Sequence, residues 1–313
     1  MIEKYFLKHG ATIESGQIAS ILRNALDKQR SNGTVPAHKR LNEALDDLDN
    51  QRLKFIKYAV PEELRPFISS WIYLEDYSGR YKTERAIPQC GASLIINLKE
   101  ERIISNSPYD AHAGTVVLFK DSMDIQNPGY TRRIYVHFTA AGLYLLTGVS
   151  QQALVNQFTD ARFIFGQAFT TLYDQLVNSD SSGEYLKFLT GFFVNLQLKT
   201  QWSGQADLIR FMINHIDAPI ISTAAKTGYT RKHVLNLFKQ FTGCSPKQFQ
   251  LTQKLHRIML QFDPVQHSLF KLTDAEDFHD EAHFCRAFKK TTGMRPLQYK
   301  HEGFYCTKRI LFH

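Results

Sequence analysis

The chain has 313 residues, of which 43% are hydrophobic and 22% are charged, and its formal net charge is +8. This length and composition suit two or three globular domains with ample core, and they exclude a fibrous or largely disordered protein. No apolar run approaches the roughly 18 residues that a membrane span needs, and the first residues lack the apolar stretch of a signal peptide, so we expect a cytoplasmic protein without a membrane partner.

Residues 1–55 are predicted to form a helical N-terminal extension. Apolar residues recur at helical spacing in two stretches, and a turn-forming segment at 31–36 separates them. The two stretches contain Ile18, Ile21, Leu22, Ala25 and Leu26, then Leu41, Ala44, Leu45 and Leu48. Such a helical hairpin cannot bury its apolar faces alone, so packing on the next domain and self-association are both open for it.

Residues 56–200 show a different pattern of apolar residues, and we interpret them as a second domain. Short apolar and β-branched runs, bounded by Gly, Pro, Asn and Asp, predict strands at 71–74, 93–98, 115–119 and 134–138. From residue 140 to residue 198 the apolar spacing becomes helical. The sequence therefore predicts an α+β fold class, in which a small cupin-like β-barrel or sandwich is followed by helices.

Residues 201–301 contain an internal repeat with an offset of fifty residues. The repeated residues are Thr230, His233, Phe238, Lys239, Thr242, Gly243, Pro246, Gln248 and Phe249, which return as Asp280, His283, Phe288, Lys289, Thr292, Gly293, Pro296, Gln298 and Tyr299. A duplicated unit with helical spacing and a Gly-x-x-Pro stop predicts an all-α domain of two tandem helix-turn-helix modules. A connecting helix from Pro246 toward Phe262 is predicted between them, and a short tail follows at 302–313.

The first module is expected to read DNA through a recognition helix at about 230–241. Gly228 suits the left-handed residue that ends the preceding helix, and Thr230 suits the N-cap. The outward positions, most of which can donate to phosphates or base edges, are Arg231, Lys232, His233, Leu235, Asn236 and Lys239. Residues 201–300 hold fourteen Lys and Arg against eight Asp and Glu, so a net +6 of the chain's +8 lies here. Double-stranded DNA is therefore the expected partner.

With both module spacings intact, residues from about 202 to 301 resemble the C-terminal DNA-binding domain of the AraC/XylS family of bacterial transcription regulators. The most typical string runs from Phe278 to Lys290. The resemblance implies that the second module also faces DNA, through Glu281, Ala282, His283, Arg286, Lys289 and Lys290. It also implies an N-terminal sensor and dimerisation domain, so RNA polymerase, a homodimer partner and a small-molecule effector of unspecified chemistry are candidate partners.

The second module departs from the family pattern in its acidic residues. Asp277 stands where the family has glycine, Glu281 where it has glutamine, and Thr273 where it has alanine. An acid at the start of a recognition helix faces phosphates with the wrong sign, although it could accept from a cytosine amino group. Two functions remain open: a sequence-specific transcription regulator, and a ligand-binding or interaction protein whose degenerate repeat has lost sequence-specific DNA binding.

No catalytic or metal-binding constellation stands out in the sequence, so we expect no enzyme, no cofactor and no metal. A phosphate-binding loop, a nucleophile elbow and a dinucleotide fingerprint are all missing. A cupin metal centre needs paired histidines, whereas His112 and His137 stand alone and are interpreted as packing residues. The four cysteines lack zinc-ligand spacing and are interpreted as reduced structural residues, of which Cys285 is the one to test for reactivity.

Overall fold

The computed structural model describes residues 53–76, 82–98, 112–127, 131–179, 181–198, 204–217, 228–261, 278, 280–296 and 298–299. The predicted helical hairpin and the tail at 302–313 lie outside these ranges. So do Cys306, Thr273, and the acidic residues Asp274, Glu276 and Asp277 of the second module. Within the described residues, no helix is both long and apolar enough to cross a membrane.

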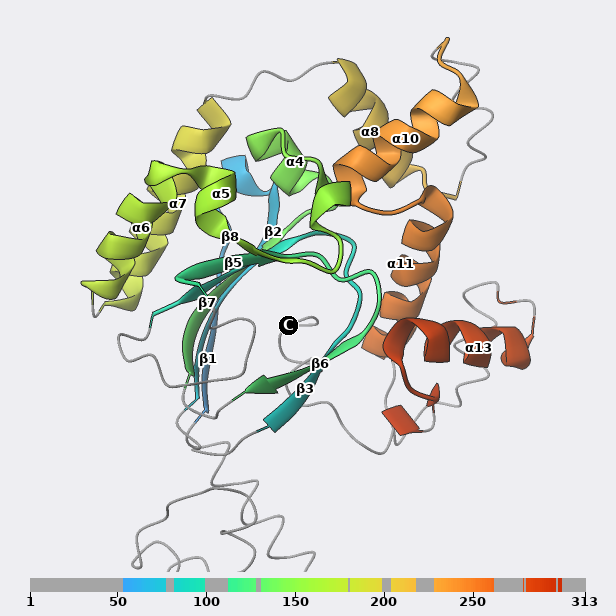
Figure 1. The fold of residues 1–313 in the computed structure, drawn as a ribbon, viewed down its shortest axis with the longest axis horizontal. Coiled ribbons are helices and arrows are strands. Elements are labelled where there is room, and N and C mark those ends of the chain that lie inside the picture. Colours follow the sequence, from blue (N-terminus) through green and yellow to red (C-terminus); the bar gives the residue numbers. More distant parts are fainter. Residues whose placement is uncertain are drawn as a thin grey trace, which may run out of the picture.

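The N-terminal part is built on a six-stranded antiparallel sheet (Figure 1). The strand order is β1 (Leu53–Tyr58), β2 (Ile68–Asp76), β7 (Thr131–Phe138), β4 (Ser93–Asn97), β5 (Gly114–Val117) and β8 (Phe158–Asp160). A separate ribbon pairs β3 (Lys82–Ala86) with β6 (Met123–Asn127). The predicted strands correspond to β2, β4, β5 and β7, and the α+β class is confirmed. Among the described strands, β1 and β8 end the sheet, which does not close into a barrel.

Four strands were not predicted, for different reasons. β3 reads KTERA and shows no apolar alternation, and β6 reads MDIQN and has only two apolar residues. β8 has only three residues and lies within a stretch of helical spacing. β1 reads LKFIKY and begins at Leu53, inside the range assigned to the N-terminal extension. β3 and β8 therefore depend on long-range pairing more than on a local pattern.

Helices cover one face of the six-stranded sheet, on the left in Figure 1. α6 (Gln167–Val177) and α7 (Ser182–Leu198) form this layer, and α5 (Ala161–Phe165) precedes them. Trp71 of β2 stacks on Phe193 of α7 with ring centroids 6.2 Å apart, and the rings of Tyr73 and Tyr185 lie 5.8 Å apart. α4 (Gly142–Thr147) and the short 3-10 helices η1 (Glu62–Leu64) and η3 (Gln151–Leu154) complete this part.

The C-terminal part is helical, as predicted. Its described helices are α8 (Gly204–Asn214), α10 (Arg231–Thr242), α11 (Pro246–Gln261) and α13 (Glu281–Thr292). α10 is the predicted first recognition helix, α11 the predicted connecting helix, and α13 the equivalent of α10 in the second module. In Figure 1, α10 and α11 follow one another down the right side of the molecule, and α13 lies beside the lower end of α11.

The internal repeat is reproduced in the caps of α10 and α13. Thr230 accepts a hydrogen bond from the backbone N–H three residues on at 3.2 Å, and Asp280 does the same at 2.5 Å. At the other end, Gly243 and Gly293 adopt left-handed φ values of 79° and 75°. A side chain is strained in that conformation, which explains glycine at both C-caps. The predicted N-cap role of Thr230 is confirmed, and Asp280, its equivalent in the repeat, caps α13.

The first module packs directly on the N-terminal part. Val234, Leu237, Phe238 and Phe241 belong to the same buried cluster as the sheet residues that α6 and α7 cover. The rings of Tyr144 and Phe241 stack with centroids 3.9 Å apart. The side-chain amide of Gln151, which is fully buried, donates to the backbone oxygens of Ala140, at 2.7 Å, and of Phe241. α10 is therefore anchored on α4 and η3.

The second module and α11 pack on the segment that follows β3. Ile87 lies in one buried cluster with Leu255 of α11 and with Phe284 and Phe288 of α13. A hydrogen bond of 2.7 Å joins His256 Nε2 of α11 to the backbone oxygen of Pro88. Both modules thus contact the N-terminal part, at two separate places.

Candidate nucleic-acid interface

The outer face of α10 presents the residues that the sequence predicted for it. Arg231, Lys232, His233 and Asn236 are exposed, whereas Leu235 and Lys239 are half-buried. The opposite face is buried through Val234, Leu237, Phe238 and Phe241. One side of the helix is therefore fixed to the protein, and the other is free to enter a groove of DNA.

The charge on this face is entirely positive. The sequence of α10 contains no acidic residue. Arg231, Lys232 and Lys239 form no ion pair with any other residue that the structure describes. A shallow groove of about 470 Å³ runs over the same surface and is lined by Arg231, Lys232, Leu235, Asn236, Lys239 and Ser245. Cationic and amide donors thus line one surface without a partner among the described residues, which suits phosphate and base-edge contacts.

A histidine in the first turn of each recognition helix packs against an aromatic ring just upstream. The rings of His233 and Tyr229 lie 4.7 Å apart, and those of His283 and Phe278 lie 5.6 Å apart. This contact orients each imidazole at the exposed end of its helix. These aromatic partners were not predicted from the sequence, although an aromatic residue near each histidine was the available signal.

The second recognition helix, α13, presents a more mixed surface. All six residues expected to face DNA are exposed: Glu281, Ala282, His283, Arg286, Lys289 and Lys290. Glu281 lies in the first turn, where an acid stabilises the positive end of the helix dipole. Lys289 and Lys290 lie in the last turn, where cations have the corresponding effect. Part of the charge pattern of α13 therefore has a purely structural explanation.

The two helices differ at equivalent positions of their outer faces. At the fifty-residue offset, Glu281 replaces Arg231, and Arg286 replaces Asn236. Lys239 keeps its charge as Lys289. The same positions are buried in both helices, although only some of the buried residues are identical, and both helices keep an N-capping side chain and a C-cap glycine. The modules thus share one scaffold and carry different surfaces.

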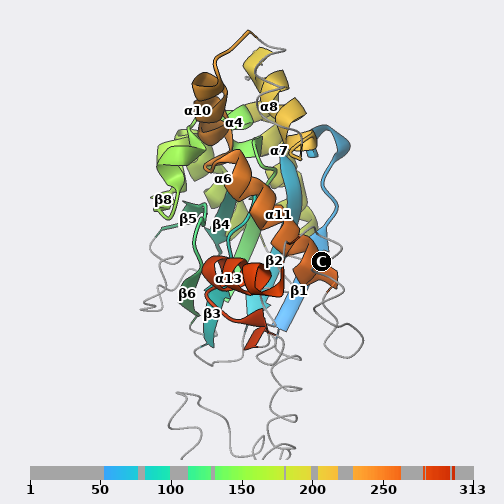
Figure 2. The ribbon, with the colours of Figure 1, turned by 90° about the vertical axis from the view of Figure 1, so that its right-hand side faces the viewer.

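α11 holds the two recognition helices apart. It has sixteen residues and is therefore roughly 24 Å long. Phe249 near its start meets Phe238 of α10 with ring centroids 5.6 Å apart. Leu255, Ile258 and Met259 nearer its end pack against α13. Figure 2 shows α10 at one end of the molecule and α13 well below it, with α11 between them.

Comparison with known families and proteins agrees with this geometry. Residues 223–302 match the family described as a helix-turn-helix domain. The chain carries an AraC-type helix-turn-helix domain. It is also 26% identical over 84 residues, which are 27% of this chain and 69% of the relative, to the probable transcription factor PqrA of Proteus vulgaris.

Solved structures with some similarity include two of ToxT from Vibrio cholerae. One, from strain O395, has 12% sequence identity and a TM-score of 0.34, and the match covers 80% of this chain and 97% of that one. The other has 13% identity and a TM-score of 0.32, with coverage of 80% and 98%.

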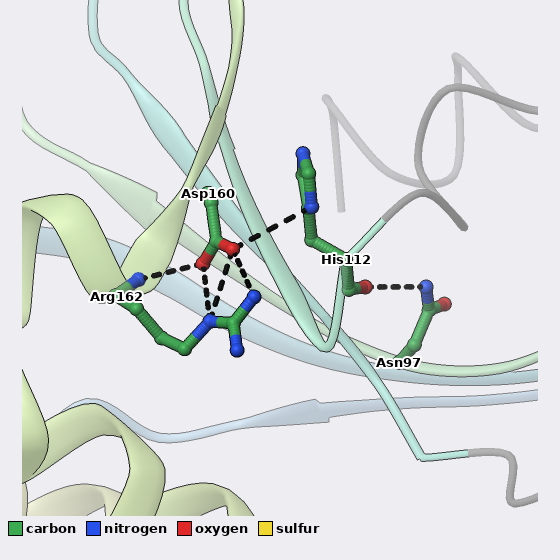
Figure 3. A network of polar contacts seen from close by, with 4 residues as sticks. All are labelled: Asn97, His112, Asp160 and Arg162. Atoms are coloured by element: carbon green, nitrogen blue, oxygen red, sulfur yellow. Dashed lines mark hydrogen bonds and ion pairs between the residues drawn. The ribbon is translucent and has the colours of Figure 1, made fainter.

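Outside the AraC-type domain, His112 takes part in a polar network at the edge of the sheet (Figure 3). Its Nδ1 lies 3.5 Å from Asp160 Oδ2, and its backbone oxygen accepts from Asn97 at 3.3 Å. Asp160 also caps α5 by accepting from the backbone N–H of Arg162 at 2.8 Å. The hydrogen bonds from the Arg162 side chain hold the pKa of this carboxyl below its usual range. The network thus stabilises the start of α5. The role of Asp160 was not predicted from the sequence.

His137 is a buried residue of the sheet. Its Nδ1 lies 2.7 Å from the Ser93 hydroxyl oxygen, whereas its Nε2 has no hydrogen-bond partner among the described residues. Burial lowers its pKa to about 4, because the charged imidazolium is poorly solvated there. Among the described residues, no group of three or more His, Cys, Asp or Glu could hold a metal ion.

The described cysteines are free thiols, namely Cys90, Cys244 and Cys285. Burial raises the pKa of Cys244 to about 11 and also raises those of Cys90 and Cys285. A raised pKa disfavours the thiolate, which is the reactive form. Cys285, which the sequence marked for testing, therefore lies in a surrounding that suppresses its reactivity.

Proposed function

We propose that the protein is a sequence-specific DNA-binding transcription regulator whose N-terminal domain responds to a small-molecule or protein signal. The outer face of α10 carries the proposal, because Arg231, Lys232 and Asn236 stand exposed on an acid-free helix within an AraC-type domain. In this proposal the protein acts in the cytoplasm on double-stranded DNA, without a catalytic step or a bound cofactor. RNA polymerase and a second copy of the chain are its candidate protein partners.

α10 is proposed to supply most of the sequence discrimination. α13 adds mainly backbone contacts through Arg286, Lys289 and Lys290, since Glu281 at its start repels phosphates. Phosphate contacts fix register and contribute affinity, whereas base-edge contacts specify sequence. The likeness of residues 223–302 to helix-turn-helix domains, and the similarity to PqrA, a probable transcription factor, support DNA binding and transcription regulation.

A salt titration on the purified full-length protein tests the proposal. The preferred site is first selected from fragments of the source genome, and binding is then measured between roughly 50 and 200 mM salt. A regulator of this kind is expected to bind its site at least roughly 10³-fold more tightly than competitor DNA. Its affinity should also fall steeply as the salt concentration rises, because each phosphate contact releases counterions.

Two variants locate the reading surface. Arg231→Ala and Asn236→Ala are each expected to weaken binding to the best site by about 1 to 3 kcal/mol, if each makes a good base contact. If Lys232 contacts one phosphate, Lys232→Ala should reduce by about 0.9 the slope of the logarithm of the binding constant against the logarithm of the salt concentration. Lys187→Ala is the matched control, because Lys187 is an exposed lysine on α7, away from the AraC-type domain. Unchanged site preference in both Arg231→Ala and Asn236→Ala would show that α10 does not read the sequence.

The second candidate function is a ligand-binding or interaction protein with a degenerate helix-turn-helix repeat. Glu281, exposed at the start of α13, is the observation that favours it. Such a protein would bind DNA weakly and without preference for one site. The competitor measurement separates the two candidates, since only a regulator retains its site in excess unrelated DNA.

A further inference from the structure

One short segment of the N-terminal part touches the ends of both recognition helices. We call this segment the strut; it consists of residues Leu118–Ser122, which join β5 to β6. A β-carbon added at Gly243, the C-cap of α10, would lie 2.3 Å from Leu118 Cδ2. A β-carbon added at Gly293, the C-cap of α13, would lie 2.7 Å from Ser122 Oγ. Equivalent glycines of the two modules thus abut opposite ends of one five-residue segment, in the close approach that glycine permits.

The strut is a further link between the two recognition helices. α11 already joins them, and each module is also anchored on the N-terminal part, α10 through Gln151 and α13 through Ile87. The strut touches each recognition helix at its C-terminal end, which in the first module lies three residues before α11 begins. It thereby ties the C-caps of the two modules to one another through a segment of the N-terminal part.

Asn156 holds the strut in place. Its Oδ1 accepts a hydrogen bond from the backbone N–H of Lys120 at 2.9 Å, and its Nδ2 donates to Asp121 Oδ2 at 3.0 Å. Its backbone N–H donates to the backbone oxygen of Leu118 at 2.8 Å. Three groups of one residue thus bind three of the five strut residues, Leu118, Lys120 and Asp121. Among the described residues, Asn156 is also the one non-glycine residue with a positive φ, 56°, a conformation that asparagine tolerates better than most residues.

The two sides of the strut are supported by further contacts. On the α10 side, Val155 forms an isolated bridge with Leu118, and its Cγ2 would lie 3.3 Å from a β-carbon at Gly243. On the α13 side, Arg85 donates to both carboxylate oxygens of Asp124, at 2.6 and 2.7 Å. Its Nη1 would lie 3.1 Å from a β-carbon at Gly293. Neighbouring residues therefore support the contact between the strut and each module.

We infer that Asn156 is a positioning residue, which sets the spacing and relative rotation of α10 and α13 by fixing the strut against their C-caps. The separation of the two DNA segments that the protein accepts then depends on a residue of the N-terminal part that touches no DNA. This dependence on DNA spacing rests on the proposed function, whereas the effect on the two helices does not. The side-chain hydrogen bonds of Asn156 lie near the surface, so their loss alters the position of the strut more than the stability of the core.

Asn156→Gly is the test variant. Glycine keeps the left-handed backbone free of strain and removes both side-chain hydrogen bonds. Asn156→Asp is the second variant, because aspartate can still accept from the Lys120 N–H but repels the Asp121 carboxylate. Asn178→Gly is the matched control: Asn178 ends α6, and its side-chain amide donates to the Asp174 backbone oxygen at 2.7 Å, away from the strut.

The first measurement needs no DNA. Genetically encoded spin labels at Lys232 and Ala282, which are both exposed, report the distance between the recognition helices by pulsed electron resonance in the full-length protein. The wild type and Asn178→Gly should give one narrow distance distribution, and both Asn156 variants should broaden or shift it. A distribution that Asn156→Gly leaves unchanged overturns the inference, whether or not the protein binds DNA.

The second measurement uses the site obtained by selection, with one or two base pairs inserted between its two halves. The wild type should prefer the original spacing, and Asn156→Gly should reduce that preference by about fivefold, as expected for two lost hydrogen bonds. A specific DNA binder that is indifferent to spacing, or an Asn156→Gly variant with the wild-type preference, overturns the inference for DNA. Failure of the wild type to select any site overturns the proposed function instead, and the distance measurement still decides the role of Asn156.

Discussion

Two glycines at opposite ends of α10 provide a matched test of how tightly the first module is docked. Gly228 and Gly243 have similar φ values of 71° and 79°. Among the described residues, a β-carbon at Gly228 would meet nothing within 4 Å, whereas one at Gly243 would lie 2.3 Å from Leu118 Cδ2 and 3.3 Å from the Gln151 oxygen. Alanine at either position carries the same backbone strain, and only Gly243→Ala adds a steric clash.

The expected costs follow from these two contributions. A left-handed alanine costs about 1 to 2 kcal/mol, part of which is offset because alanine also restricts the unfolded chain. We therefore expect Gly228→Ala to lower the free energy of unfolding by about 1 kcal/mol. Overpacking against buried Leu118 adds about 1 to 3 kcal/mol, so Gly243→Ala should cost about 2 to 4 kcal/mol.

Urea denaturation of the full-length protein measures the difference, with circular dichroism and tryptophan fluorescence recorded together. Coincident transitions of the two probes are required before free energies are compared, because a protein with several packed parts can unfold in steps. Equal destabilisation by the two alanine variants would refute the tight packing of the α10 C-cap on the strut.

Three further predictions concern the core, the DNA-facing surface and the pH dependence of stability. Phe288→Ala should cost about 3 to 5 kcal/mol of stability, since this side chain is only 2% exposed, and a fully stable variant in thermal unfolding would contradict the core of the second module. Glu281→Gln should strengthen DNA binding in a fluorescence anisotropy titration because it removes repulsion from phosphates; weaker binding by a folded variant would show that Glu281 reads a base. The pKa of His137 is lowered from 6.5 to about 4 in the folded protein, so as the pH falls the unfolded chain takes up a proton on this residue before the folded protein does. The stability contribution of neutral His137 is therefore full above pH 6.5 and should decline by roughly 3 kcal/mol as the pH falls to 4. Denaturation at pH 7 and pH 5 should show this loss, and His137→Gln should reduce it; an unaltered pH dependence in that variant would contradict the assignment.

The helix-turn-helix elements could be predicted from the sequence because their signals are local. The N-caps Thr230 and Asp280 and the C-cap glycines lie within a few residues of the helix ends that they specify. The buried stripe of α10 follows from helical periodicity alone. The repeat then strengthens each assignment, since two copies with the same pattern are unlikely to arise from composition.

The docking of the modules on the N-terminal part could not be predicted in this way. Gln151 and Phe241 are 90 positions apart, and Pro88 and His256 are 168 positions apart. Neither pair has a pattern that links its two members, because a backbone oxygen can accept from any donor that the fold brings near. No sequence pattern predicts the role of Asn156 either, because its left-handed backbone and its contacts with the strut follow from the tertiary fold. Isolated residues of this kind become visible only in three dimensions.

The pattern of change between the modules separates structural from functional constraint. Some positions that hold the scaffold are the same in both copies: Phe238 and Phe288 are buried, and the hydroxyls of Thr242 and Thr292 both donate to the backbone oxygen four residues earlier at 2.8 Å. Outer positions have diverged, with Arg231 replaced by Glu281. If these outer side chains read bases, as proposed, the two modules are expected to prefer different base sequences. If the proposed function holds, one chain therefore recognises two unlike DNA segments in a fixed order, and the contacts that hold α10 and α13 in register matter as much for the choice of site as the residues that face the DNA.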